Sequence, residues 1–142
     1  MILYLDTSAL VKLYVEEPGS QAVRTLLEKA QIVSTSRVAY VEMRAGLARK
    51  LRQGELREKE YKHILSEFEK DWKNYFVIEV SEGVAKLGSE LVEKHPLRVL
   101  DALHLASALF LRERVRSDVF FSSFDGKLNE AAQAEGLAVP TA

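Results

Sequence analysis

Four short apolar runs limit what this chain can fold into, because each is too short for a buried helix. They lie at residues 2–5, 32–33, 76–80 and 119–122, and longer segments with helical periodicity separate them. Short apolar strands that alternate with helices predict a parallel sheet covered on both faces, since parallel strands need crossovers and helices supply them. We therefore expect an α/β fold.

The segments between these runs predict seven helices. They are expected at residues 8–15, 20–30, 36–53, 56–74, 81–94, 97–114 and 124–135. Gly54 separates the third from the fourth, which predicts a helical hairpin whose charged part, residues 49–74, protrudes. Residues 137–139 suggest a further edge strand, so the sheet is expected to have four to five strands.

The composition fits one compact domain over residues 1–142, of which 47% are hydrophobic. The absence of cysteine excludes thiol catalysis, cysteine-bound zinc and disulfides, and it fits a reducing compartment. A net charge of −1 excludes the broad positive field of a protein that coats nucleic acid, so any nucleic-acid binding must use a local patch.

Charged residues interrupt every apolar run well before the roughly 18 residues that a membrane span needs. The opening sequence MILYLDTSAL has no basic region ahead of a long apolar stretch, as a secretory signal would. We therefore expect a cytoplasmic protein with no membrane segment.

Two acidic residues, Asp6 and Asp125, directly follow predicted strands, where ligands bind in open α/β sheets. Capping of the next helix is an equally good explanation for each taken alone. Ser8 and Ser123 are close enough in sequence to hydrogen-bond these carboxylates and to orient them, although both serines could also be caps.

Glu42 and Asp101 are harder to explain as structural residues, because each is predicted on an apolar helix face. Glu42 is predicted to share a buried helix face with Val38, Val41 and Ala45, and Asp101 lies within LRVLDALHLASAL. A carboxylate in such surroundings must be paired, protonated or bound to a ligand. Arg44 and Arg98 are the candidate ion-pair partners, and they are equally candidate RNA contacts.

The connectivity can bring all four acids to one edge of the sheet. Carboxylates about 5 Å apart repel by roughly 3 kcal/mol per pair at an effective dielectric constant near 20, and a divalent cation reverses that sign. An all-oxygen site suits Mg²⁺ or Mn²⁺, which use carboxylates, waters and phosphates as ligands. The pattern therefore predicts hydrolysis of a phosphodiester by a metal-activated water.

Four segments together resemble the successive motifs of PIN-domain ribonucleases, and in particular the VapC toxins of toxin–antitoxin pairs. They are LDTSALVKLYVEEPGS, SRVAYVEMRAGLAR, LRVLDALHLASAL and FFSSFDGKL, in family order and with similar spacing over nearly the whole chain. The resemblance implies a three-layer α/β/α fold and endonuclease activity on RNA that depends on Mg²⁺ or Mn²⁺. It also implies a homodimer and a VapB-type antitoxin that blocks the site.

By position, the resemblance assigns the family's catalytic and metal-binding acids to Asp6, Glu42, Asp101 and Asp125. The last of these is the most variable acid of the family. The hydroxyl residue two places before it is commonly Thr in the family and is Ser123 here, which keeps the hydroxyl group.

Histidines suggest a different enzyme, a metal-free ribonuclease in which imidazoles act as general acid and base. Of His63, His95 and His104, only the last is near the acids in sequence, three residues after Asp101. A metal-binding Asp–His pair is conceivable there, but a histidine hydrogen-bonded within the core is favoured.

Two other α/β classes with acidic sites fit poorly. A receiver domain needs a Lys after a late strand and an Asp after a central one, but the third strand ends in Val80-Ser81-Glu82. A haloacid-dehalogenase-type phosphatase needs a second Asp at position 8, which is Ser8. Basic residues that could contact an RNA backbone around the acids are Arg37, Arg44, Arg49, Lys50, Arg52, Arg98 and Lys127.

Overall fold

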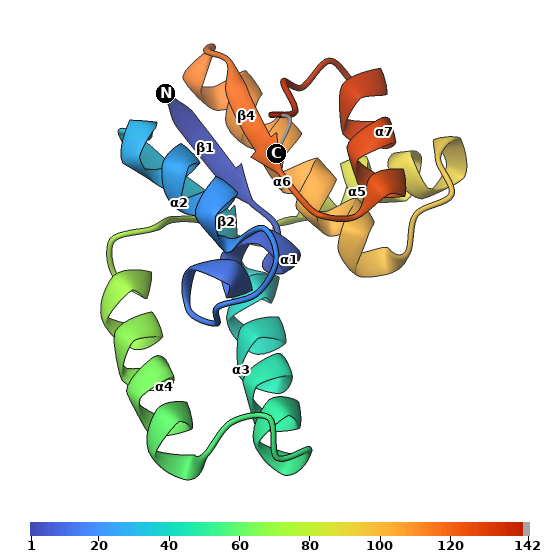
Figure 1. The fold of residues 1–142 in the computed structure, drawn as a ribbon. Helices are drawn as coiled ribbons and strands as arrows, with labels where there is room; N and C mark the ends of the chain where they lie inside the picture. The colour runs from blue at the N-terminus through green and yellow to red at the C-terminus, as the bar shows by residue number, and fades with distance from the viewer. Residues whose placement is uncertain (141–142) are drawn as a thin grey trace.

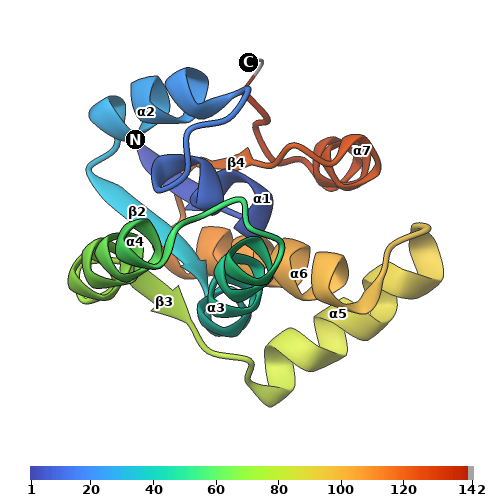
Figure 2. The same ribbon diagram turned by 60° about the horizontal axis from the view of Figure 1, so that its bottom comes forward.

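The computed structural model describes residues 1–140 and shows three layers, with helices on both faces of a central sheet (Figures 1 and 2). The strands are β1 (Ile2–Leu5), β2 (Ile32–Ser36), β3 (Phe76–Ile78) and β4 (Val119–Ser122). The helices are α1 (Thr7–Leu10), the 3₁₀ turn η1 (Val11–Leu13), α2 (Ser20–Lys29), α3 (Arg37–Arg52), α4 (Glu58–Trp72), α5 (Glu82–Lys94), α6 (Val99–Val115) and α7 (Gly126–Ala134).

All the strand pairs of the sheet are parallel, in the order β3-β2-β1-β4. The α/β fold class expected from the sequence is therefore confirmed. The first strand occupies a central position, so the residues that follow it reach the middle of the sheet edge. Residues 137–139 were expected to add a strand, but they form only an isolated bridge between Ala138 and Phe120.

The second strand is longer than its apolar run predicts. It continues through Ser34, Thr35 and Ser36, which are all buried. The Ser34 hydroxyl donates to the carbonyl of Phe76 over 2.7 Å, and the Thr35 hydroxyl donates to the carbonyl of Leu5 over 2.7 Å. These bonds satisfy the hydroxyl groups inside the sheet, so a polar sequence that resembles a turn becomes a buried strand.

Alternate side chains of β1 enter two separate apolar clusters. Tyr4 packs with residues of α5, α6 and α7, whereas Leu3 and Leu5 pack with residues of α1 to α4. This alternation is the period of a β-strand, and both faces are apolar because helices cover both. The sheet therefore lies between two helical layers, and β1 contributes side chains to both.

Helices α3 and α4 lie side by side and extend beyond the sheet as the expected hairpin (Figure 1). Phe68 and Trp72 of α4 pack in the same cluster as Met43 and Leu47 of α3. No helix within residues 1–140 is both long and apolar enough to cross a membrane.

Phe121 gives a direct test of the sheet core, because it is fully buried and its ring stacks on Tyr4 with centroids 5.6 Å apart. Phe121→Ala should lower the free energy of unfolding by about 3–5 kcal/mol, measured by urea denaturation. Phe76→Ala is the matched control on an edge strand, where the phenylalanine is 55% exposed, and it should cost about 0.5 kcal/mol or less. Equal losses in the two variants would contradict this description of the core.

Candidate functional site

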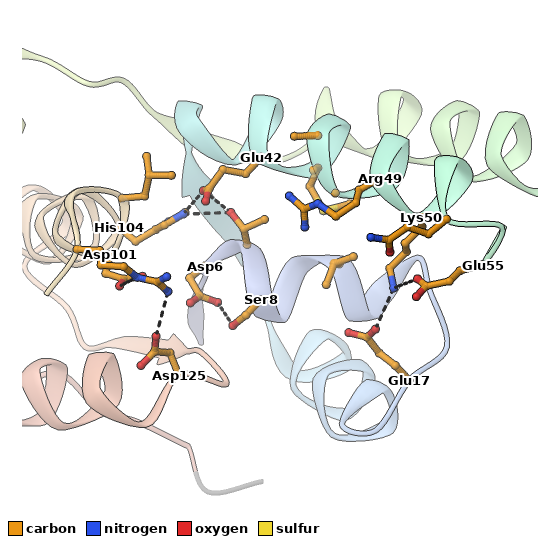
Figure 3. A pocket seen from close by; sticks show the side chains of 18 residues that line it. Asp6, Ser8, Glu17, Glu42, Arg49, Lys50, Glu55, Asp101, His104 and Asp125 are labelled. Carbon is orange, nitrogen blue, oxygen red and sulfur yellow. Dashed lines mark hydrogen bonds and ion pairs between the residues drawn. The ribbon is translucent and has the colours of Figure 1, made fainter.

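A pocket of about 710 Å³ opens beyond the carboxyl ends of β1 and β4, and all four acids predicted from the sequence line it (Figure 3). They come from four different elements or connections. Asp6 follows β1, Glu42 lies on α3, Asp101 lies in the first turn of α6, and Asp125 precedes α7. The expected convergence of these acids at one edge of the sheet is therefore observed.

Asp6 is 4% exposed and also caps α1, because its Oδ1 accepts a hydrogen bond of 3.0 Å from the backbone N–H of Ala9. The Ser8 hydroxyl donates to the same oxygen over 2.7 Å. Burial raises the pKa of Asp6, and His104, Ser123 and Ser8 oppose that rise. Capping and a place in the pocket are thus compatible roles for this carboxylate.

Ser8 also connects the two strand ends, because its oxygen accepts a hydrogen bond of 2.9 Å from the backbone N–H of Phe124. Ser123 accepts a hydrogen bond of 3.0 Å from the backbone N–H of Asp125. Both serines therefore lie where they can orient the strand-end acids, Ser8 by direct contact with Asp6 and Ser123 through the loop before α7.

Asp125 caps α7 by accepting the N–H groups of Lys127 and Leu128 on its Oδ1. Its side chain is 33% exposed, and its Oδ2 lies 4.0 Å from the guanidinium of Arg98. The same guanidinium lies 3.4 Å from Asp101, whose side chain is 20% exposed. Arg98 is thus the ion-pair partner expected for Asp101, and it balances Asp125 as well.

Glu42 lies at the border of the buried face of α3 and not within it. Helix α3 buries Ala39, Met43 and Leu47, while Val41 is 69% exposed. The expectation that Val41 shares a buried face with Glu42 is wrong, because the face of α3 that packs against the rest of the protein is centred on Met43 and not on Glu42. The side chain of Glu42 is 25% exposed and points into the pocket (Figure 3).

Two side chains hold the carboxylate of Glu42. The Thr7 hydroxyl donates to its Oε1 over 2.6 Å, and Nε2 of His104 lies 2.8 Å from the same oxygen. Partial burial raises the pKa of Glu42, but the hydrogen bonds from His104 and Thr7 outweigh it, so that the pKa is lowered overall. Glu42 therefore remains ionised at neutral pH.

The three histidines lie in different surroundings. His104 is 2% exposed and hydrogen-bonded in the core, as expected. His95 contacts Glu135 over 2.6 Å, and His63 is exposed on α4. Because only one histidine among the described residues lines the acidic pocket, a pair of imidazoles acting as acid and base is not assembled there.

The donor set of the pocket fits a hard divalent cation. The four predicted carboxylates are oxygen donors, and burial raises the pKa of Asp6 because it makes the charged form costly. Within residues 1–140, however, no three acidic or histidine side chains approach closely enough to form a ready coordination shell. The structure thus supplies suitable donors around one cavity, but it does not gather them into a finished metal site.

Of the seven basic residues suggested by the sequence, Arg37, Arg44, Arg52 and Lys127 are outside the pocket lining. Arg44 is outside the pocket lining and pairs with Glu69 over 3.0 Å, so it is not the partner of Glu42. Arg49, Lys50 and Arg98 do line the pocket. Lys50 lies 3.4 Å from Glu55 and 3.9 Å from Glu17, at the end of the pocket away from Asp6 (Figure 3).

Sequence reasoning missed Thr7 and Tyr4. Thr7 bonds Glu42, and the hydroxyl group of Tyr4 lies 2.8 Å from Nδ1 of His104. A signal for Tyr4 was available, because a tyrosine in the buried run ILYL must find a hydrogen-bond partner. No comparable signal marked Thr7, which follows the strand as an ordinary first residue of a helix.

Comparison with known proteins agrees with this geometry. The PIN-domain family model matches residues 3–134, so the chain belongs to the PIN-domain family. Among its relatives, "Ribonuclease VapC45" of Mycobacterium tuberculosis is 34% identical, covering 99% of this chain and 96% of the relative. "Ribonuclease VapC3" of Pyrobaculum aerophilum is 34% identical, covering 76% of this chain and 82% of the relative. The resemblance to VapC-type ribonucleases is therefore confirmed.

Solved structures show the same fold. The FitAcB structure from Neisseria gonorrhoeae aligns with a TM-score of 0.68 at 16% identity, covering 99% of this chain and 97% of that one. The VapC20 structure from Mycobacterium tuberculosis, described as a sarcin-ricin loop cleaving toxin, aligns with a TM-score of 0.65 at 16% identity. It covers 96% of each chain. The three-layer α/β/α architecture expected from the resemblance is therefore confirmed.

The ionised side chain of Asp6 should lower the free energy of unfolding of the metal-free protein. Because burial raises its pKa above the ordinary 3.8, stability is lost as the pH rises from that value through the folded-state pKa. Asp6→Asn keeps an oxygen that accepts from Ser8 and Ala9 but carries no charge. In EDTA at pH 7 the variant should therefore melt at a higher temperature than the wild type, and the difference should shrink towards pH 4.

The control for this measurement is Asp118→Asn, which removes an exposed carboxylate at the opposite end of the sheet. It should not reproduce the stabilisation. An Asp6→Asn variant that melts below the wild type at pH 7 in EDTA would contradict the interpretation that burial of a charge dominates at Asp6.

Proposed function

We propose that this protein is a divalent-metal-dependent endoribonuclease and the toxin of a toxin–antitoxin pair. The observation that supports this most strongly is the meeting of Asp6, Glu42, Asp101 and Asp125 in one pocket beyond the strand ends. The relatives named as VapC ribonucleases, which align over nearly the whole chain, support the choice of RNA as substrate.

In this proposal the four carboxylates hold Mg²⁺ or Mn²⁺, since hard cations prefer oxygen ligands. Such an ion, when bound, activates a water and stabilises negative charge on a phosphodiester. Asp6 and Glu42 are held in place by Ser8 and Thr7, respectively. Asp101 and Asp125 both form ion pairs with Arg98. In this proposal the guanidinium moves away from the two carboxylates when they bind a cation.

Basic side chains on the pocket wall suit the RNA backbone. Arg49 and Lys50 lie on the same helix as Glu42, seven and eight residues further along, which places them about two turns from it. Arg98 is 86% exposed beside the acids, and it is a candidate RNA contact. Arg44, paired with Glu69 outside the pocket, is the weaker of the two RNA contacts suggested by the sequence.

A VapB-type antitoxin is the proposed protein partner. Solved relatives include "VapBC2 from Rickettsia felis bound to a DNA fragment from their promoter", which has the same fold at a TM-score of 0.68 and 16% identity.

We also propose a homodimer in the cytoplasm. Exposed apolar side chains support an interface between chains, since Val41 is 69% exposed and Val99 is 71% exposed.

Cleavage of RNA by the purified protein should require a divalent metal. We expect activity with Mg²⁺ or Mn²⁺ and none in excess EDTA, because the carboxylates alone cannot stabilise charge on phosphate. Asp6→Asn and Asp101→Asn should lower kcat/KM by more than the roughly 10- to 100-fold typical of groups that only orient a ligand. Gel analysis of a labelled RNA measures both effects.

Asp118→Asn is the control for these variants and should retain full activity, because this residue lies before β4 and outside the pocket lining. Cleavage that persists in EDTA, or folded Asp6→Asn and Asp101→Asn proteins with wild-type rates, would refute the metal mechanism.

The product of a small reading frame next to this gene should bind the protein and inhibit RNA cleavage. We expect a stable complex by size-exclusion chromatography and loss of activity at equimolar ratio, because an antitoxin must close the acidic pocket. A neighbouring product that neither binds nor inhibits would count against the toxin assignment while leaving the nuclease proposal intact.

A further inference from the structure

His104 lies at the centre of a hydrogen-bonded chain that runs from the sheet core to the pocket. It is 2% exposed, and Nδ1 lies 2.8 Å from the hydroxyl group of Tyr4, which is fully buried in the sheet. Nε2 lies 2.8 Å from Oε1 of Glu42 and 3.1 Å from the hydroxyl oxygen of Thr7. Both ring nitrogens therefore have partners, and the ring connects Tyr4 of β1 to Glu42. Figure 3 shows the contact between His104 and Glu42.

The direction of each hydrogen bond follows from the partners. An ionised carboxylate only accepts hydrogen bonds, so Nε2 must carry a proton and donate a hydrogen bond to Glu42. In the neutral ring Nδ1 is then an acceptor, and the Tyr4 hydroxyl donates to it. The Thr7 hydroxyl donates to the same Oε1 of Glu42 over 2.6 Å. Every polar hydrogen in this series of hydrogen bonds therefore has an acceptor.

Both of these hydrogen bonds to Glu42 end on Oε1. No other hydrogen bond to its carboxylate is present among residues 1–140, so Oε2 keeps its lone pairs for a ligand. Fixing one oxygen also restricts the rotation of a long, partly exposed side chain, so that less conformational entropy is lost when Glu42 binds a ligand.

We propose that His104 is a positioning residue that holds Glu42 in its ligand-binding orientation, with Tyr4 fixing the imidazole and Thr7 sharing the carboxylate oxygen. The proposal rests on the proposed function, because it takes Glu42 to be a ligand of the metal. The second contact of Glu42, to Thr7, cannot replace the ring, since a hydroxyl on α1 restrains the carboxylate from one side only.

Metal affinity measures this role without any cleavage reaction. Mn²⁺ is titrated into the protein, and electron paramagnetic resonance measures the free ion. The titration gives the Kd for the wild type, His104→Leu and His104→Gln. His104→Leu should weaken Mn²⁺ binding about 10- to 100-fold, as expected for loss of a group that orients a ligand. His104→Gln should restore most of the affinity, because its amide N–H extends about as far from the backbone as Nε2 and can donate to Glu42.

Three further measurements separate positioning from a purely structural role. Melting in EDTA shows whether each variant is folded, and RNA cleavage should show a fall in kcat with little change in KM. His63→Leu removes an exposed histidine of α4 and should leave the Kd for Mn²⁺ unchanged. Equal Kd values for folded His104→Leu and wild type would overturn the proposal, as would equal losses in His104→Leu and His104→Gln.

The wild-type protein itself provides a test that needs no variant. Nitrogen-15 spectra of the imidazole should show a proton on Nε2 of His104, and a ring that carries its proton on Nδ1 alone would overturn the proposal. Failure of the wild type to bind Mn²⁺ would instead refute the proposed metal-dependent function. Mn²⁺ binding that needs Glu42 but tolerates His104→Leu would refute only the positioning role.

Discussion

Asp6 is a carboxylate held almost out of contact with water at the end of the central strand, and much of the surrounding architecture accommodates it. Burial of a charge is costly unless hydrogen bonds or opposite charges compensate it. Here Ala9 and Ser8 both donate hydrogen bonds to one oxygen of the carboxylate. Since Ser8 also binds the backbone after β4, the same contacts that satisfy Asp6 join the two strand ends that frame the pocket.

The other acids are accommodated in different ways, which gives them unequal roles. Asp101 and Asp125 face a single exposed cation, Arg98, and retain partial access to solvent. Glu42 has no arginine partner among the described residues and depends on neutral or shared hydrogen bonds from Thr7 and His104. One part of the pocket is therefore hydrogen-bonded to buried residues of the core, and the charges of the other part are balanced by an exposed arginine.

Local sequence patterns predicted much of this molecule, because they reflect local physical chemistry. The apolar run ILYL and the alternation with helical segments were sufficient for the fold class. The strand-end positions of Asp6 and Asp125 made them candidates for the pocket, although capping explained each residue equally well. Prediction failed where long-range contacts decide the outcome. Ser34 and Thr35 extend β2 because neighbouring strands pair with it and accept hydrogen bonds from their hydroxyl groups.

The sequence by itself determined an α/β chain with four acids and the motifs of the PIN-domain family. Only the tertiary structure decided which neighbours those acids have. Glu42 meets His104, which is 62 residues away in sequence, and Arg44 turns to Glu69 although it is two residues from Glu42. Periodicity specifies which side of a helix a residue occupies, but the packing of one helix against the others decides what lies opposite that side.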